Sequence, residues 1–103
     1  MTCLVTGATG FIGRALLPKL AERDEVVALG RRTPDGTDCV RWVRQDLTQP
    51  LDESALPKGV DAIIHLAQSE RYREFPGGAV DMTEVNVAST VRLLDYCHRS
   101  GGT

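Results

Sequence analysis

The stretch that decides the fold is Thr6-Gly7-Ala8-Thr9-Gly10-Phe11-Ile12-Gly13, in which glycine occupies every third position from residue 7 onward. An apolar run over residues 2–6 precedes it directly, which is typical of a short buried strand. After it, an apolar residue recurs every four positions, which predicts a helix over residues 11–23. The residues that mark one face of this helix are Ile12, Leu16 and Leu20. The glycines therefore lie in a turn that leads from a strand into a helix.

Each glycine of this turn has a physical use if an anion binds there. Gly7 permits the tight turn out of the strand, Gly10 lets a pyrophosphate approach the backbone, and Gly13 lets the helix pack close to the sheet. The amides of Phe11 and Ile12 have no partner inside the helix, so they favour an anion together with the helix dipole. The alternative is that the glycines serve only the turn. The flanking strand and helix favour a dinucleotide site formed by Gly7, Thr9, Gly10, Phe11, Ile12 and Gly13.

Strand and helix patterns alternate along the rest of the chain. The further elements that we expect are strands at residues 25–29, 40–44 and 61–66, a turn at Thr33-Pro34-Asp35-Gly36, a short helix around residues 52–56, and a long helix over residues 80–100 that ends at Gly101-Gly102. This order is typical of βαβ units with right-handed crossovers. It predicts an α/β fold with a Rossmann-type three-layer parallel sheet, a truncated half with the strand order 3-2-1-4.

The apolar pattern also predicts which surfaces are buried. The strands are apolar throughout rather than alternating, which is typical of strands that are buried on both faces. The apolar residues that mark the long helix are Val87, Val91, Leu94 and Cys97. Pro18 removes one backbone hydrogen bond from the first helix, but the periodicity continues past it, so we expect the helix to continue as well.

The composition argues against several classes of function. Lys and Arg number 12 and Asp and Glu number 14, so the chain has no basic excess for nucleic acid or for an anionic membrane. No apolar run approaches the ~20 residues that span a bilayer, and the N-terminus does not resemble a signal peptide. Cys3, Cys39 and Cys97 match no metal or redox spacing, and we expect them to be packing residues. We therefore expect a cytoplasmic protein without nucleic-acid, membrane or metal partners.

The glycine spacing resembles that of a known superfamily. Glycines at 7, 10 and 13 are similar to the TGxxGxxG pattern of the short-chain dehydrogenase/reductase superfamily, and TGATGFIG resembles its extended branch, the NAD(P)-dependent epimerase/dehydratase family. Further segments that support the resemblance, in the family's order, are Asp46-Leu47-Thr48, His65-Leu66-Ala67 and Asn86-Val87-Ala88-Ser89-Thr90. The resemblance covers the whole chain. It implies an NAD(P)-dependent epimerase, dehydratase or reductase acting on a nucleotide-sugar or a related carbonyl or hydroxyl substrate.

The resemblance also implies roles for individual residues. Asp46 and Leu47 would lie against adenine, with the carboxylate accepting a hydrogen bond from the exocyclic amine; a local turn is the alternative for this aspartate. Asn86 would either order the helix and nearby backbone or touch the cofactor. His65 is structural in the family, and we do not expect it to be catalytic. The residues expected to line the cofactor where the fourth strand ends are Leu66, Ala67 and Gln68.

The end of the second strand bears on the choice of cofactor. An acidic residue at this position would bind the ribose hydroxyls of NAD, but the sequence there is Leu29-Gly30-Arg31-Arg32. Two guanidinium groups suit a ribose 2′-phosphate through charge-assisted hydrogen bonds. We therefore expect NADP as the cofactor, with NAD as the alternative. The competing interpretation is that Arg31 and Arg32 belong to a solvated loop.

The catalytic residues that the resemblance implies do not occur in this chain. The family uses a Tyr whose pKa is lowered by a Lys four residues later, together with a Ser or Thr. Tyr72 is followed at that distance by Pro76, and Tyr96 by Ser100. We therefore expect no catalytic residue here, and we interpret residues 1–103 as a partial NAD(P)-binding domain that lacks the later strands and the substrate domain.

Other interpretations remain open from the sequence. The main alternative to part of an enzyme is a non-catalytic, sensor-like module that binds a dinucleotide. A flavin- or mononucleotide-binding domain is a third, and it explains the arginine pair and Asp46 less well. The fourth strand would form an open sheet edge, a template for pairing, so we expect a homo-oligomer through this edge or marginal stability.

Overall fold

The computed structural model describes residues 1–32 and 40–101. Its elements are β1 (Thr2–Thr6), α1 (Phe11–Ala21), β2 (Glu25–Gly30), β3 (Arg41–Arg44), the 3₁₀ turn η1 (Glu53–Ala55), β4 (Ala62–His65), α2 (Ala79–Thr83), the π-helical turn η2 (Glu84–Ala88) and α3 (Ser89–Arg99). The α1 helix continues through Pro18, as expected, and ends two residues earlier than predicted. Three features of the sequence analysis lie outside the described residues: the turn expected at Thr33-Pro34-Asp35-Gly36, the cysteine Cys39, and Gly102.

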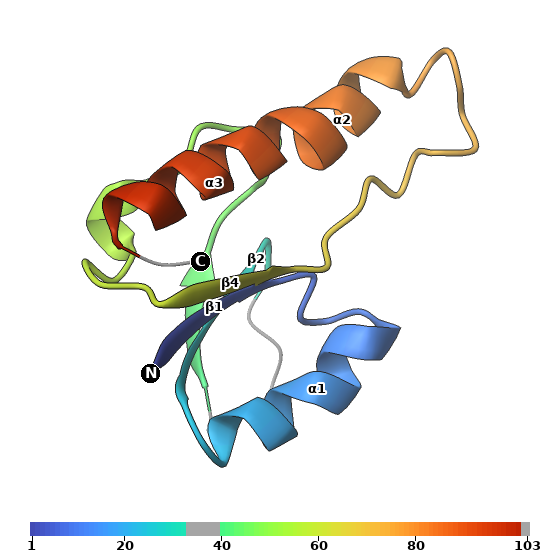
Figure 1. Ribbon diagram of the computed structural model, residues 1–103. Coiled ribbons are helices and arrows are strands. Elements are labelled where there is room, and N and C mark those ends of the chain that lie inside the picture. The colour runs from blue at the N-terminus through green and yellow to red at the C-terminus, as the bar shows by residue number, and fades with distance from the viewer. Residues whose placement is uncertain (33–39, 102–103) are drawn as a thin grey trace.

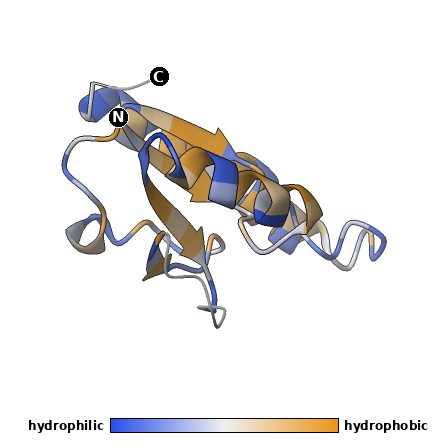
Figure 2. Ribbon diagram, turned by 90° about the horizontal axis from the view of Figure 1, so that it is seen from below, coloured by the Kyte–Doolittle hydropathy of each residue, from blue (hydrophilic) through white to orange (hydrophobic). Residues whose placement is uncertain are grey.

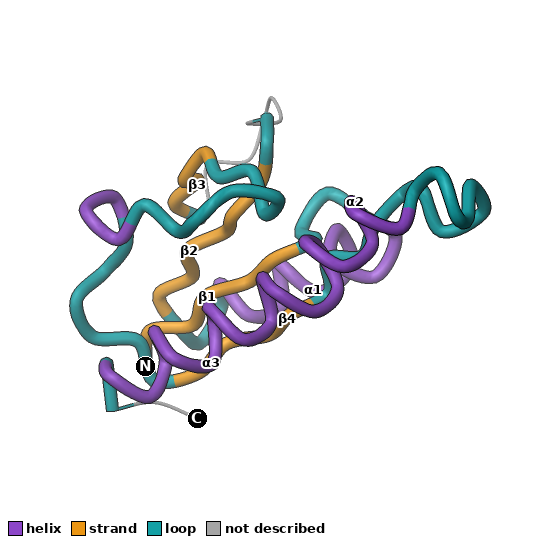
Figure 3. The backbone as a smooth tube through the Cα atoms, turned by 90° about the horizontal axis from the view of Figure 1, so that it is seen from above, coloured by secondary structure: helices purple, strands orange, loops and turns teal. Residues whose placement is uncertain are grey.

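The strands form one parallel sheet in the order β3-β2-β1-β4, which confirms the predicted topology. The register places Thr6 of β1 beside Leu29 of β2 and His65 of β4, so the carboxyl ends of these strands lie together. The α1 helix covers one face of the sheet, and the continuous helical segment α2-η2-α3 covers the other (Figure 1). Seen from above, α3 runs along the β1 and β4 side of the sheet (Figure 3). The fold therefore has the three layers of a Rossmann-type domain.

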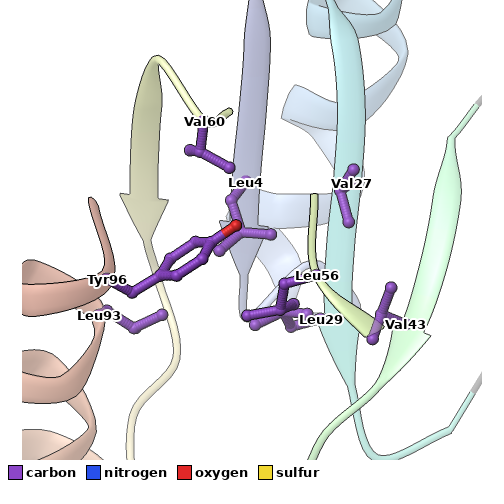
Figure 4. Close-up of a cluster of buried hydrophobic side chains, with 8 residues drawn as sticks. All are labelled: Leu4, Val27, Leu29, Val43, Leu56, Val60, Leu93 and Tyr96. Carbon is purple, nitrogen blue, oxygen red and sulfur yellow. The ribbon is translucent and has the colours of Figure 1, made fainter. Parts of the chain in front are cut away.

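A hydrophobic core on each face of the sheet holds the layers together. Successive side chains of a strand point to opposite faces, so β1 contributes Cys3 and Val5 to one core and Leu4 to the other. On the α1 face, these two residues pack with Leu17 of the helix. The buried residues of the α3 face are Leu4, Val27, Leu29, Val43, Leu56, Val60, Leu93 and Tyr96 (Figure 4).

Burial on both faces holds for the two central strands only. Residues 3–6 of β1 and 26–29 of β2 are buried, whereas β3 buries Val43 alone and all of β4 is half-buried. The expectation was wrong for the outer strands because each of them pairs with a neighbouring strand on one side only. Apolar residues nevertheless concentrate along the strands, while polar residues lie on the helices and in the loops (Figure 2).

The buried stripe of α1 differs from the predicted face. Ile12 is 64% exposed, whereas Gly13 and Leu17 are buried and Leu16 and Leu20 are half-buried. A Cβ built at Gly13 would lie 2.4 Å from a backbone oxygen of the glycine turn, so the helix comes closest to the sheet at this glycine. The buried stripe therefore passes through a residue that contributes no side chain to the apolar periodicity.

The long helical segment likewise buries a different face from the predicted one. The exposed residues among those that marked it are Val87, Val91 and Leu94, at 57%, 60% and 65% exposure. Cys97 is buried as expected, but the residues that this helix contributes to the core are Leu93 and Tyr96. The hydroxyl of Tyr96 also donates a hydrogen bond to the carbonyl of Pro57. Apolar residues occur on both sides of this helix, so periodicity alone did not identify the face that packs on the sheet.

The two cysteines in the described part of the chain are buried, which agrees with a packing role. Burial raises the pKa of the Cys3 thiol and so disfavours its thiolate. Within residues 1–32 and 40–101, no cluster of metal-ligating side chains is present, and no helix has both the length and the apolar character needed to cross a bilayer.

Candidate functional site

The carboxyl ends of the strands open onto a cleft. The β1 and β4 strands end at the same edge of the sheet, and α1 begins there (Figure 1). In open parallel sheets, ligands bind in the crevice outside the carboxyl ends of the strands. The cleft has a volume of about 440 Å³, within the roughly 300–1,000 Å³ that is usual for small-molecule sites. The predicted site residues that line it are Gly7, Thr9, Gly10, Arg31, Asp46, Leu47, Leu66, Ala67 and Gln68.

The glycine turn forms the part of the cleft wall next to α1. Gly7 has a φ of +67°, and a Cβ there would lie 2.5 Å from the backbone carbon of Leu66, so this position requires glycine. The amide of Gly10 donates to the carbonyl of Gly7 at 3.1 Å, and the amide of Arg14 donates to the carbonyl of Gly10 at 2.9 Å. The amides of residues 11–13 come before the Arg14–Gly10 hydrogen bond of the helix. They therefore form the polar N-terminus that a helix offers to an anion.

The remaining residues of the glycine turn differ in their surroundings. Gly13 is buried against the backbone of Gly7 and Ala8, where it sets the distance between α1 and the turn. Phe11 and Ile12 expose their side chains to solvent, at 90% and 64%. Any contribution of these two residues to the cleft therefore comes from their backbone amides.

Arg31 follows β2 and reaches across the cleft. Its Nη2 lies 3.4 Å from Oε1 of Glu70, which follows β4, so this ion pair joins segments on opposite sides of β1. Both side chains are exposed, and such a pair contributes little to stability. Arg32 is also exposed and lies outside the cleft lining. The Arg31 guanidinium therefore remains accessible to an anionic ligand.

Asp46 follows β3 and forms the local turn that was one of its two expected roles. Its Oδ1 accepts hydrogen bonds from the Thr48 amide at 2.9 Å and from the Thr48 hydroxyl at 2.7 Å. These two hydrogen bonds lower the pKa of Asp46, and the charge of Arg31 lowers it further. Asp46 and its neighbour Leu47 line the cleft, so an ionised carboxylate is available there.

The wall after β4 is tied to the helical segment by Ser69. The amide of this buried residue donates to Oδ1 of Asn86 at 2.8 Å, and its hydroxyl donates to Oδ2 of Asp81 at 2.5 Å. Asn86 lies in the π-helical turn, a local widening that often occurs at functional sites. Of the two roles left open for Asn86, the structure shows the ordering of nearby backbone.

The same wall is tied to β1 by Thr6. The backbone amide of Leu66 donates to the carbonyl of Thr6 at 3.2 Å, and the amide of Ala67 donates to the Thr6 hydroxyl, also at 3.2 Å. His65, the last residue of β4, is half-buried and is not among the residues that line the cleft. Burial lowers the pKa of His65, which favours a neutral imidazole.

Sequence reasoning missed several polar residues of the site. The cleft is also lined by Gln45, Thr48, Ser69 and Asp81, and by Glu70 and Arg71 of the loop that follows β4. Gln45 and Ser69 directly adjoin predicted residues at strand ends, so a wider window there would have found them. Asp81 reaches the cleft only because α2 packs beside the β4 wall, and no local sequence signal marks it.

The chain matches known proteins along its whole length. The sequence profile of the NAD dependent epimerase/dehydratase family matches residues 3–103. UDP-glucuronic acid decarboxylase 6 of Arabidopsis thaliana is 30% identical over 112 aligned positions, which cover 98% of this chain and 31% of that protein. The chain thus spans about a third of the length of the curated relatives that it matches.

Solved structures show the same arrangement of the backbone. A short-chain dehydrogenase/reductase superfamily protein from Agrobacterium tumefaciens, solved with bound NAD, is 31% identical with a TM-score of 0.78, over 97% of this chain and 30% of that one. The protein MoeE5, in complex with UDP-glucuronic acid and NAD, is 32% identical with a TM-score of 0.76, over 99% of this chain and 34% of that one.

Proposed function

Because the chain belongs to the NAD dependent epimerase/dehydratase family, we propose that its cleft binds the dinucleotide NAD(P). The observation that carries this proposal is the glycine turn at the start of α1: Gly7, Thr9 and Gly10, the last of them the N-cap of the helix, line a cleft of about 440 Å³. We propose that the diphosphate is held by Gly7, Thr9 and Gly10 and by the amides of Phe11 and Ile12, with Gly13 setting the helix position. These amides would offer hydrogen-bond donors and the positive end of the helix dipole.

We propose that the two halves of the dinucleotide occupy different parts of the cleft, each beside the end of a different strand. The adenosine half lies near Asp46 and Leu47 after β3, and the nicotinamide half lies along Leu66, Ala67 and Gln68 after β4. Asn86 acts on this second wall through the Ser69 amide. The bound cofactor would supply a nicotinamide ring that accepts or donates hydride.

Titration of the chain with NADPH, NADH and FMN, followed by calorimetry or by nucleotide fluorescence, tests the proposal. Saturable binding of a nicotinamide dinucleotide with one site per chain is expected, because both halves of the cleft and the diphosphate turn are present. FMN has a single phosphate and no adenosine, so it should bind more weakly. Failure of both dinucleotides to bind at neutral pH would overturn the proposed function.

The whole protein's reaction is proposed from the relatives. UDP-glucuronic acid decarboxylase 6 and MoeE5 are both described with UDP-glucuronic acid, which supports a nucleotide-sugar as the substrate class. Within such a reaction, residues 1–103 would contribute the cofactor site, since the sequence contains no Tyr followed by Lys four residues later. These relatives do not support the alternative of a non-catalytic module. Epimerisation, dehydration or reduction through a keto intermediate is the corresponding reaction class.

We further propose NADP as the preferred cofactor, on the strength of Arg31. Arg31→Gln is expected to raise the Kd of NADPH by roughly tenfold or more, because a charge-assisted hydrogen bond to the 2′-phosphate is lost. The Kd of NADH should stay within about twofold, since NADH has no such phosphate. Arg32→Gln is the matched control and should have a smaller effect, because Arg32 lies outside the cleft lining. Equal weakening of NADPH and NADH by Arg31→Gln would contradict the preference.

Self-association through a sheet edge stays a prediction. The β3 and β4 strands are the outer strands of the described sheet, and β4 is half-buried throughout. Unpaired strand edges favour pairing with another chain. Analytical ultracentrifugation is expected to show a concentration-dependent dimer or larger species. A monomer at every concentration, with a sharply cooperative thermal transition, would contradict this expectation.

A further inference from the structure

A chain of hydrogen bonds passes through His65 and joins three elements behind the cleft. Nδ1 of His65 lies 2.5 Å from the hydroxyl oxygen of Thr6 at the end of β1. Nε2 of the same ring lies 3.0 Å from the hydroxyl oxygen of Thr90 in α3. The Thr6 hydroxyl also accepts the amide of Ala67, a residue of the cleft wall. The Thr6 hydroxyl oxygen therefore links the His65 ring, through two hydrogen bonds, to the Ala67 amide in the cleft wall.

The partners at the two ends determine where the protons lie. The Thr90 hydroxyl lies 2.9 Å from the carbonyl oxygen of Asn86, which can only accept, so its single hydrogen is donated there. The Thr90 oxygen must then accept from His65, which places the ring proton on Nε2. Nδ1 of the neutral ring is left as an acceptor, and the Thr6 hydroxyl donates to it. Every donor in this series of hydrogen bonds has an acceptor only when His65 is neutral.

Protonation of His65 would break this arrangement at Thr6. A second ring proton on Nδ1 would point at the hydrogen of the Thr6 hydroxyl, only 2.5 Å away from oxygen to nitrogen. Thr6 is fully buried, so its hydroxyl would have to turn its hydrogen away without access to water. The Thr6 oxygen is the acceptor of the Ala67 amide, so a change at this hydroxyl reaches the cleft wall directly.

The charged groups around His65 have partners of their own. On the helical segment that packs against β4, Asp81 accepts the Ser69 hydroxyl, and Glu84 pairs with Arg92 at 3.3 Å. Farther along α3, Arg99 pairs with Asp95 and with Glu53. Cys3 is the titratable side chain of β1, and Tyr96, Cys97 and His98 are those that remain on α3. Burial is the cause of the lowered pKa of His65, and none of these charges contributes to it.

We propose that His65 is a positioning residue for the cofactor cleft: in its neutral form, between Thr6 and Thr90, it fixes the Leu66–Ala67 wall, and its protonation weakens dinucleotide binding. This inference rests on the proposed function, since it concerns affinity for the same cofactor. It goes beyond that function by coupling the cofactor site to a single proton at a residue that does not line the cleft.

The first test is the pH profile of NADH binding, because NADH lacks the 2′-phosphate, which would itself take up a proton near pH 6. The dissociation constant is expected to be constant from pH 8.5 to neutrality and to rise in mild acid, by up to about tenfold per pH unit, as expected for one proton. His65→Asn and His65→Gln place an amide near only one ring nitrogen or the other, so both variants should bind more weakly at pH 8. Neither side chain can titrate, so both variants should also lose the slope. His98→Gln is the matched control, because His98 is an exposed histidine of α3. It should keep both the affinity and the slope.

Paired substitutions at Thr90 separate positioning from folding. Thr90→Val removes the acceptor for Nε2 at nearly constant volume and should raise the NADPH dissociation constant roughly threefold to tenfold, the effect of one lost hydrogen bond. Thr90→Ser keeps the hydroxyl and should restore the affinity. A purely structural role would lower the urea midpoint of Thr90→Val without changing affinity at low urea. Nitrogen NMR of the imidazole should show the proton on Nε2 in the wild type.

The outcomes are distinct for the two proposals. If the wild type binds no dinucleotide at pH 8, the proposed function fails and this inference fails with it. If the wild type binds, but Thr90→Val matches it in affinity or the His65 variants keep the acid slope, only the positioning role of His65 is overturned. A ring proton found on Nδ1 at neutral pH would overturn it as well.

Discussion

Gly13→Ala is expected to lower the free energy of unfolding by about 3 kcal/mol, near the upper end of the usual cost of overpacking. The added Cβ would lie 2.4 Å from the carbonyl oxygen of Gly7 and 2.6 Å from the Cα of Ala8. Both atoms belong to the backbone of the turn, so no flexible side chain can move aside. Either α1 must shift away from the sheet, or the turn must open. Urea denaturation followed by circular dichroism measures the change.

The control for this substitution is another glycine of the same chain. A Cβ at Gly59 meets no atom within 4 Å. Gly59→Ala should therefore change the free energy of unfolding by less than ~1 kcal/mol, and in the stabilising direction if the unfolded chain loses freedom. Similar midpoints for Gly13→Ala and Gly59→Ala would show that α1 does not pack against the turn as described.

Gly10→Val is expected to reduce the affinity for NADPH by roughly a hundredfold, a loss of about 2.7 kcal/mol, while leaving the chain folded. Gly10 lies on the cleft lining, and its backbone angles of −75° and 179° are accessible to any residue. A Cβ there would lie 3.3 Å from the carbonyl oxygen of Gly7, a contact that a small shift relieves. The side chain would occupy the space through which a diphosphate approaches the amides of α1. Calorimetric titration measures the loss.

A graded series strengthens this second prediction. Gly10→Ala should lose less affinity than Gly10→Val, because a methyl group fills less of the approach to the amides. The circular dichroism spectra of both variants should match the wild type, in contrast to Gly13→Ala. Wild-type affinity in Gly10→Val would show that the diphosphate does not lie against this turn, and the proposed binding mode would then be wrong.

The sequence was sufficient to predict the strand order and the place of the cleft. The glycine turn lies between an apolar run and a helical pattern, and right-handed crossovers leave few arrangements for the strands that follow. The observed order β3-β2-β1-β4 confirms this inference. The ends of parallel strands meet at one edge, so Arg31, Asp46 and Ala67, far apart in sequence, line the same cleft.

The faces of the helices were harder to predict, for a physical reason. A glycine at a close approach is invisible to an apolar periodicity, yet Gly13 sets the buried stripe of α1. In α3, valines and leucines lie on both sides, and Leu93 and Tyr96 fill the core while Val91 and Leu94 face solvent. Which side packs depends on the shape of the sheet surface, and this shape is formed by residues from several strands.

By itself, the sequence determined the α/β class, the strand order and the residues at the strand ends, because these follow from local periodicity, glycine geometry and the handedness of crossovers. Only the tertiary structure decided the partners of those residues. Arg31 is paired with Glu70, Ser69 is held by Asn86 and Asp81, and His65 bridges two threonines. Such pairings join residues from different elements, so they depend on how the layers pack, and no pattern within a single segment contains that information.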